Sequence, residues 1–310
     1  MDDIVLEVHE LKKQFGSIKA VDGLDLEVRR GDVFGFLGPN GAGKSTTIRA
    51  MAGLVRPSGG EVRIFGHDVW HNRKKALSHV GMLIESPGLY RYLTGRQNLE
   101  LFAELAGGVC AGDIKRALDI VGLSDRADDK VKNYSHGMRQ RLGVAQAILC
   151  QPKLVVLDEP TDGLDPQGMK EIRELIRSLA EEHNITVFLS SHLLHEVEQV
   201  CTKVAVIHKG RKLADGKVSE ILARRGRVRI TVDRPNDAMR AITEIEGVRA
   251  ELSEDSRLSV EIGPDYDAAE INKFLVENGF RVSALVPEVT SLEEFYFSLM
   301  GKESAKTNQA

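Results

Sequence analysis

Residues 33–46 read VFGFLGPNGAGKST, and this stretch decides the fold of the N-terminal part of the chain. It opens with a short continuous apolar run, which is typical of a strand buried in a parallel sheet. A glycine-rich turn follows, and apolar residues then recur at helical spacing at Ile48, Met51 and Val55. A strand, a glycine loop and a helix in this order predict the beginning of an α/β unit.

The turn fits the pattern G-x-x-x-x-G-K followed by Ser or Thr. Glycines let successive N–H groups turn inward around an anion, and the following helix adds its positive end. We expect Lys44 to reach the β- and γ-phosphates of ATP and the Ser45 hydroxyl to bind Mg²⁺. A chance glycine turn is the alternative, but the flanking strand and helix argue against it. The predicted ATP-binding loop comprises Gly38, Pro39, Asn40, Gly41, Ala42, Gly43, Lys44, Ser45 and Thr46.

A second buried-strand pattern, residues 154–157, ends in Asp158 and Glu159. Open α/β sheets place their ligands at the carboxyl ends of the strands. We therefore expect Asp158 to hold Mg²⁺, and Glu159, which projects differently, to act as a general base or to position the attacking water. The alternative is a capped loop after a strand, which the neighbouring phosphate loop makes the weaker interpretation.

The remaining patterns surround this core. An antiparallel strand pair is predicted before it, with the second strand after Asp22 and Gly23, and a helix-rich stretch at 89–149. Further strands are predicted at 185–189, 204–208 and 212–214.

The pattern changes around residues 223–226, a basic stretch that we interpret as a linker. Beyond it the order β-α-β-β-α-β-α, with a hairpin turning at Glu254 and Asp255, resembles a ferredoxin-like α+β unit. The last helix is predicted to begin with a capping box from Ser291 to Glu294 and to bury Leu292, Phe295 and Leu299. We predict domains at 1–222 and 227–301 and a disordered tail at 302–310. The smaller domain carries no catalytic spacing, and regulation, dimerisation and inert packing all stay open.

The composition of the chain limits which partners and which cellular location we expect. The formal net charge is −4, which does not favour nucleic acid as a partner. Cys110, Cys150 and Cys201 fit neither a disulfide framework nor a metal site, and they indicate a reducing cytoplasm. No apolar run approaches the roughly 20 residues that cross a bilayer, and the acidic N-terminus is not a signal peptide. We expect a cytoplasmic protein whose membrane role, if any, comes through a partner.

Three further motifs carry a family resemblance. Residues 134–141 read YSHGMRQR shortly before the Asp158 strand, residues 163–166 read GLDP just after it, and residues 190–192 read SSH at the end of the next strand. Over about residues 4–216 the chain resembles the nucleotide-binding subunit of an ABC transporter. The resemblance implies an α/β P-loop ATPase core with an antiparallel β subdomain and a helical subdomain that carries the signature motif.

The resemblance also implies site residues. Ser135 and Gly137 of the signature would grip the γ-phosphate of the ATP bound to an opposite subunit, which implies a head-to-tail dimer, either a homodimer or a heterodimer of ABC subunits. Asp165 would link the two sites, and His192 would be the switch histidine that contacts the γ-phosphate. Phe15 would stack on adenine, since stacking needs only a π-face; a core aromatic is the alternative.

Two departures from the family pattern stand out. The signature has His136 in place of a glycine and Met138 in place of a glutamine, which affects the dimer contact. Glu85 follows the predicted strand at 80–84, where a glutamine is usual, and a carboxylate there would tighten Mg²⁺ binding. A neutral substitution with water in the gap is the alternative. Residues 84–94 resemble the bacitracin-resistance and lantibiotic-immunity branch of ABC exporters.

The segment after Glu85 would receive a helix of the membrane subunit, with Leu89, Tyr90, Tyr92 and Leu93 as contact residues; packing inside the helical subdomain is the alternative. We predict an ATPase that drives separate transmembrane permease subunits from the inner face of the membrane and exports a peptide antibiotic, drug or lipid. A soluble ABC ATPase acting on ribosomes or repair complexes and a regulatory protein without turnover are the competing hypotheses. The predicted catalytic residues are Lys44, Glu159 and His192, and the predicted metal ligands are Ser45, Asp158 and Glu85.

Overall fold

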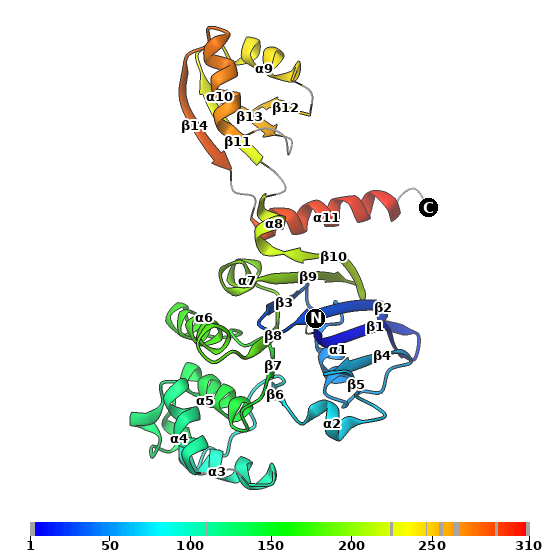
Figure 1. Ribbon diagram of the computed structural model, residues 1–310, viewed down its shortest axis with the longest axis vertical. Coiled ribbons are helices and arrows are strands. Elements are labelled where there is room, and N and C mark those ends of the chain that lie inside the picture. The colour runs from blue at the N-terminus through cyan, green and yellow to red at the C-terminus, as the bar shows by residue number, and fades with distance from the viewer. Residues whose placement is uncertain are drawn as a thin grey trace. The chain divides into compact units, whose positions relative to one another are not determined.

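The computed structural model describes residues 4–108, 111–223, 226–245, 247–253, 257–262, 267–288 and 291–307. The chain divides into two compact units, Met1–Gly216 and Lys217–Ala310 (Figure 1). Our predicted boundary lies a few residues later. The structure groups α8 (Val218–Ala223) with the second unit, where it contacts the last helix, α11 (Leu292–Thr307).

The first unit contains a six-stranded sheet (Figure 1). Its strands are β3 (Val33–Leu37), β6 (Val80–Leu83), β7 (Leu154–Asp158), β8 (Thr186–Ser191), β9 (Lys203–His208) and β10 (Arg211–Lys217). They are arranged in the order β10-β9-β3-β8-β7-β6. Every residue of β3, β7 and β8 is buried, as continuous apolar runs in a parallel sheet require.

Parallel pairing brings the carboxyl ends of three strands together. Leu37 at the end of β3 lies opposite Ser191 of β8. Asp158 at the end of β7 lies opposite Ser190 of β8. The residues that follow these strands therefore meet at one edge of the sheet, which is where ligands bind in α/β folds.

A four-stranded antiparallel sheet packs beside the large one and shares its core with α1 (Lys44–Met51). Its strands are β1 (Ile4–Phe15), β2 (Ile18–Arg29), β4 (Gly59–Ile64) and β5 (His67–Asp68), in the order β2-β1-β4-β5. The predicted start of the second strand was wrong, because the turn lies at Gly16 and β2 already begins at Ile18. Gly23 adopts φ 75° inside β2, where the pairing register shifts, so this glycine forms an irregularity within the strand.

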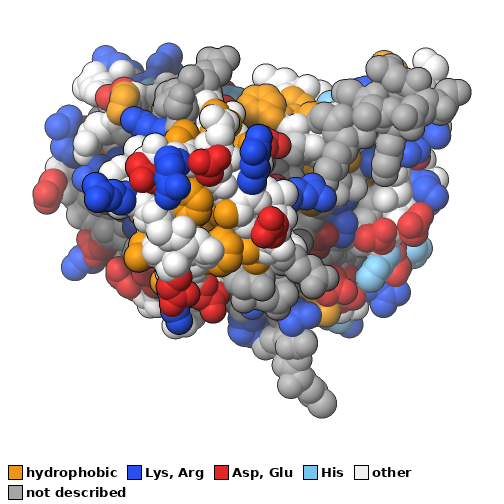
Figure 2. All heavy atoms as spheres, turned by 90° about the horizontal axis from the view of Figure 1, so that it is seen from above, with side chains coloured by type: hydrophobic (Ala, Val, Ile, Leu, Met, Phe, Trp, Pro, Cys, Tyr) orange, Lys and Arg blue, Asp and Glu red, His pale blue; other side chains and the backbone are white. Residues whose placement is uncertain are grey.

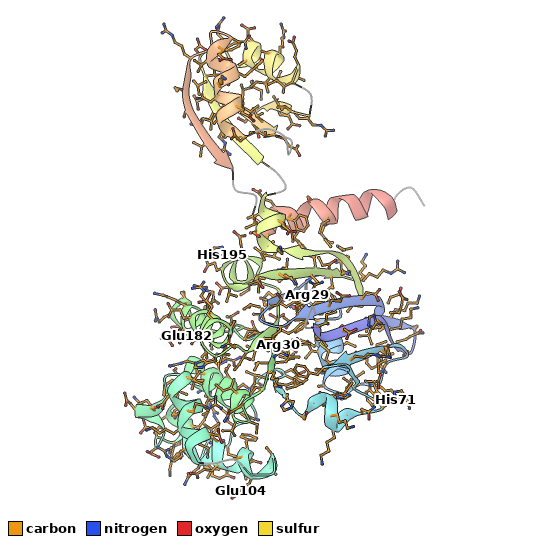
Figure 3. The ribbon with its side chains drawn as sticks, in the orientation of Figure 1. Arg29, Arg30, His71, Glu104, Glu182 and His195 are labelled. Carbon is orange, nitrogen blue, oxygen red and sulfur yellow. The ribbon has the colours of Figure 1, made fainter. Side chains whose placement is uncertain are left out.

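Helices complete the first unit, and the predicted helix-rich stretch forms a subdomain in which α3, α4 and α5 contact one another. At the start of α3, Thr94 and Gln97 form a capping box. In Figure 3, the label Glu104 locates α3 of this subdomain. The labels Glu182 and His195 locate the end of α6 and helix α7. The helices are α2 (Arg73–Leu77), α3 (Gly95–Leu105), α4 (Ala111–Ile120), the 3₁₀ turns Ser124–Arg126 and Val131–Asn133, α5 (His136–Ile148), α6 (Pro166–Glu181) and α7 (Leu194–Val200).

The second unit has the predicted ferredoxin-like arrangement. An antiparallel sheet in the order β12-β13-β11-β14 encloses its own core with two helices. The predicted turn at Glu254 and Asp255 lies outside the described residues. The elements are β11 (Gly226–Val232), α9 (Pro235–Thr243), β12 (Arg249–Leu252), β13 (Leu258–Ile262), α10 (Ala268–Glu277) and β14 (Val282–Glu288).

The last helix differs from the prediction in two ways. Of the predicted capping box, the structure gives the bond from the Glu294 N–H to Ser291 Oγ. Leu292 is buried, as predicted, but Phe295 and Leu299 are only half-buried. The helix also continues to Thr307, into the segment that we predicted as a disordered tail. Residues 302–306 include Lys, Glu and Ala, whose helix propensities are high.

Candidate active site

The phosphate loop joins β3 to α1, and it depends on glycine at points of close backbone approach. A Cβ on Gly38 would lie 2.5 Å from the Ile207 carbonyl oxygen, and one on Gly43 would lie 2.4 Å from that of Ala20. Gly43 also adopts φ 106° as the N-cap of α1. Only glycine fits both positions, so the sequence pattern specifies a loop whose N–H groups lead into a helix N-terminus.

Lys44 lies at the start of α1 and is only 5% exposed. Its Nζ donates to the carbonyl oxygens of Gly38 at 2.7 Å and Pro39 at 3.3 Å, and it lies 3.0 Å from Glu159 Oε1. A buried ammonium needs such partners. Phosphate oxygens could replace these oxygen ligands, since they offer the same chemistry with more negative charge.

Asp158 and Glu159 stand at the end of β7, where Ser190 of the neighbouring strand bonds the side chain of the first and the backbone of the second. Ser190 Oγ donates to Asp158 Oδ1 at 2.6 Å and accepts the Glu159 N–H at 3.0 Å. Asp158 is buried, at 3% exposure. Ser190 belongs to the SSH motif but had no predicted role; the signal was a hydroxyl at the polar end of a buried strand.

Each oxygen of the Glu159 carboxylate has a partner. Besides Lys44, its Oε2 lies 2.9 Å from His192 Nδ1 and accepts the His192 backbone N–H at 3.3 Å. Glu159 adopts φ 49°, a left-handed conformation that non-glycine residues rarely take. This turn directs its carboxylate toward Lys44 and His192. The structure thus brings together the phosphate loop, Asp158, Glu159 and His192, which come from the ends of three strands.

The other predicted ATP-contacting residues lie at helix starts. Ser135 is the N-cap of α5 and its Oγ accepts the Met138 N–H at 3.2 Å, while Gly137 is half-buried in the first turn. Asp165 is the N-cap of α6 and its Oδ1 accepts the Gly168 N–H at 3.0 Å. Each side chain caps its own helix, and among the described residues neither cap hydrogen-bonds to the phosphate loop.

Tyr134 opens the signature and anchors it. Its side chain is 3% exposed and its hydroxyl donates to the Arg126 carbonyl at 2.6 Å. Burial raises the pKa of the Tyr134 phenol, which keeps it a hydrogen-bond donor. This residue thus ties the start of the signature to the turn at Arg126.

The predicted adenine and metal residues have specific surroundings. Phe15 is 49% exposed, with Lys13 Nζ 4.7 Å from its ring centroid, so the core-aromatic alternative is wrong. Glu85 adopts φ 63° and forms an ion pair with Arg49 of α1. The side chains of Arg49 and Glu85 are 40% and 59% exposed. Both predicted residues are therefore accessible, and Glu85 already has a cationic partner.

The fold and this constellation define a P-loop ATPase, and comparison with known proteins gives its family. Residues 21–162 match the model of the ABC transporter family. The chain is 40% identical over 301 residues to the bacitracin transport ATP-binding protein BcrA of Bacillus licheniformis, covering 96% of this chain and 97% of the relative. It is 40% identical over 235 residues to the daunorubicin resistance ATP-binding protein DrrA3 of Streptomyces coeruleorubidus, covering 75% and 74%.

A solved structure supports the same family. CbiO1 of Clostridium perfringens, part of the ABC transporter complex CbiONQ, superposes with a TM-score of 0.65 at 29% identity and covers 72% of this chain and 92% of its own. The protein belongs to the ATP-binding subunits of ABC transporters, and its activity is ATP hydrolysis coupled to transport. The predicted family, fold class and activity are confirmed, against the non-transport alternatives.

Proposed function

We propose that this subunit hydrolyses MgATP with Lys44, Glu159 and His192 and thereby drives a separate membrane permease that exports a peptide antibiotic, drug or lipid. The observation that carries the chemistry is the Glu159 carboxylate held 3.0 Å from Lys44 Nζ and 2.9 Å from His192 Nδ1. ATP phosphates would draw Lys44 away from Glu159. The freed carboxylate could then orient water and accept its proton, with His192 beside the γ-phosphate.

The oxygen donors at the sheet edge suit Mg²⁺. Ser45 offers a hydroxyl at the start of α1, and Asp158 offers the carboxylate oxygen that Ser190 leaves free. The described residues contain no group of three or more His, Cys, Asp or Glu that could hold a metal. Mg²⁺ does not need one, because it usually keeps water and phosphate ligands beside one or two protein oxygens. Bound Mg²⁺ would neutralise charge on the β- and γ-phosphates.

A head-to-tail dimer would complete each site. Ser135 and Asp165 are exposed and cap helices whose first N–H groups can meet an anion. Phe15 is accessible for adenine. In the proposed dimer, Ser135 and Gly137 of one subunit reach the ATP that Lys44 of the other subunit holds.

The permease contact is proposed at the loop before α3. Tyr90 and Tyr92 are 42% and 67% exposed, and their rings pack edge to face at 5.9 Å. Buried Asn98 holds this loop, accepting the Tyr90 N–H at 2.8 Å and donating to the Tyr90 carbonyl at 3.1 Å. Exposed aromatic side chains on an ordered loop suit a protein interface. The two tyrosines are therefore exposed rather than packed inside the helical subdomain, whereas Leu89 and Leu93, the other two predicted contact residues, are half-buried.

The proposal also covers the location of the subunit and the substrate of the permease. No helix in the described part of the chain has the length and apolar character needed to span a bilayer. We propose, from the transporter family of the chain, that the permease holds the subunit at the inner membrane face. Cationic and anionic side chains are mixed on the face shown in Figure 2, with no broad basic area among the coloured residues. The names of the bacitracin and daunorubicin relatives support an antibiotic or drug as cargo.

Affinity purification from gently solubilised membranes of the native cells tests this proposal. The Glu159→Gln protein with ATP should recover a polytopic protein that lacks ATPase motifs, and its identity would narrow the substrate. Recovery of ribosomes alone, or of no partner, would contradict the transport assignment. Replacing Tyr90 and Tyr92 with alanine should lower recovery of the permease, whereas Leu105→Ala, at another exposed apolar residue of the same region, should not.

A further inference from the structure

The first residue of the signature helix reaches the loop that follows Glu159. His136 Nδ1 lies 2.9 Å from the carbonyl oxygen of Gly163. A carbonyl can only accept, so Nδ1 carries the proton and donates. The family pattern has a glycine at position 136, which could not make this bond. The contact is therefore a feature of this chain that the general mechanism does not explain.

Gly163 is shaped for this contact. It adopts φ 68°, where a side chain would be strained, and a Cβ placed there would lie 3.1 Å from His136 Cε1. The imidazole thus packs against the bare side of Gly163 while bonding its carbonyl.

Further contacts join the signature helix α5 to helix α6, which follows the Gly163 loop. A Cβ on Gly137 would lie 3.8 Å from Gly168 Cα, so the first turns of α5 and α6 lie in close contact. Farther along, Arg141 Nη2 lies 3.4 Å from Glu171 Oε2. The Gly163 contact extends this packing from α6 back into the loop before it.

The loop between Glu159 and Asp165 is short and internally bonded. The Asp162 N–H donates to the Glu159 carbonyl at 3.1 Å, and the Leu164 N–H donates to the Thr161 carbonyl at 3.3 Å. Gly163 lies within this bonded loop, with Glu159 on one side of it in the chain and Asp165 on the other. His136 ties this loop to the residue next to Ser135.

We propose that His136 is a positioning residue that couples the signature helix to the Glu159 loop. The inference rests on the proposed function of Ser135 and Glu159. When Ser135 engages the nucleotide of the opposite subunit, the His136–Gly163 bond holds the loop so that Glu159 and Asp165 are aligned at the same time. His136 itself contacts no reacting atom.

The test compares two substitutions of similar size in the full-length protein. His136→Leu removes the donor, whereas His136→Asn places an amide N–H close to the position of Nδ1. We expect kcat for ATP hydrolysis to fall about tenfold in His136→Leu, the effect of one lost hydrogen bond, with KM unchanged. His136→Asn should restore most of the rate. His183→Leu, which removes an exposed histidine after α6, is the matched control and should leave kcat unchanged.

Hydrogen–deuterium exchange gives a second readout that needs no turnover. In the nucleotide-free protein, the amides of Asp162 and Leu164 should exchange faster in His136→Leu but not in His136→Asn. Wild-type kcat in His136→Leu, or equal losses in both variants, would overturn the proposal. Failure of the proposed dimer would show differently, as absence of ATP-dependent association in Glu159→Gln while the exchange difference persists.

Discussion

Glu159 and Glu85 share an unusual backbone conformation, with φ of 49° and 63°. Such conformations cost a non-glycine residue on the order of 1 kcal/mol, and they collect at functional sites. Each glutamate follows a strand of the parallel sheet, and each turns its carboxylate to a cation: Lys44 for Glu159 and Arg49 for Glu85. Each carboxylate is therefore held in an ion pair, and we expect a bound ligand to replace one partner of that pair.

This pairing yields a prediction about Mg²⁺. If Glu85 acts beside the metal, it must leave Arg49, so Arg49→Gln should lower the Mg²⁺ concentration for half-maximal hydrolysis by about two- to fivefold, the scale of one exposed ion pair. Glu85→Gln should raise it by a similar factor. Mg²⁺ titration of ATP hydrolysis, and of nucleotide binding without turnover, measures both.

The two variants control each other because they break the same ion pair. If the Arg49–Glu85 ion pair only stabilised the fold, both variants would shift the half-maximal Mg²⁺ concentration in the same direction. Unchanged titrations in both variants would instead support the neutral interpretation of Glu85, with water beside the metal.

At the scale of elements, the helices that follow the loops after β7 and β8 are joined to each other. Helix α6 begins after Asp165 and α7 begins after His192. Arg173 of α6 and Glu196 of α7 form an ion pair at 2.5 Å, and their side chains are 19% and 13% exposed. The pair therefore fixes the two helices whose starts carry Asp165 and His192.

Removing one partner of this pair should destabilise the protein. Arg173→Met leaves Glu196 largely buried without its cation, and we expect the free energy of unfolding to fall by about 2–3 kcal/mol, somewhat less than for a fully buried pair. Urea denaturation measures the change. Arg173→Met combined with Glu196→Leu should recover much of the loss, because both charges are then absent. Lys170→Met, in an exposed ion pair on α6, is the control; an equal loss there would contradict this account.

The strands were more predictable than their connections. Continuous apolar runs identify β3, β7 and β8, since only a doubly covered parallel sheet buries every residue. The start of β2 was misplaced because Asp22-Gly23 has the composition of a turn, while the actual turn at Gly16 carries a weaker signal.

The candidate site residues were predicted from the sequence, but their contacts were not. The phosphate loop, Asp158 and Glu159 were predicted from a motif and a strand end, and His192 from the family resemblance. The contacts of Glu85 with Arg49 and of His136 with Gly163 join residues far apart in the chain. Such contacts depend on side-chain packing between elements, which no sequence period encodes.

At the scale of the whole molecule, the proposed function divides each ATP site between two subunits. The phosphate loop meets Glu159 and His192, while Ser135 and Asp165 are exposed at the starts of other helices. We therefore expect two copies, or this chain and a related subunit, to close around ATP before Glu159 acts.

The most direct test is the state of Glu159→Gln with MgATP, measured by size-exclusion chromatography with analysis of the bound nucleotide. We predict a stable dimer that retains unhydrolysed ATP, with phosphate release at least about 100-fold slower than in the wild type, the scale of general-base catalysis. Glu181→Gln, at an exposed carboxylate near the end of α6, should behave as wild type. Wild-type phosphate release by Glu159→Gln, or ATP binding without any dimer, would contradict the account.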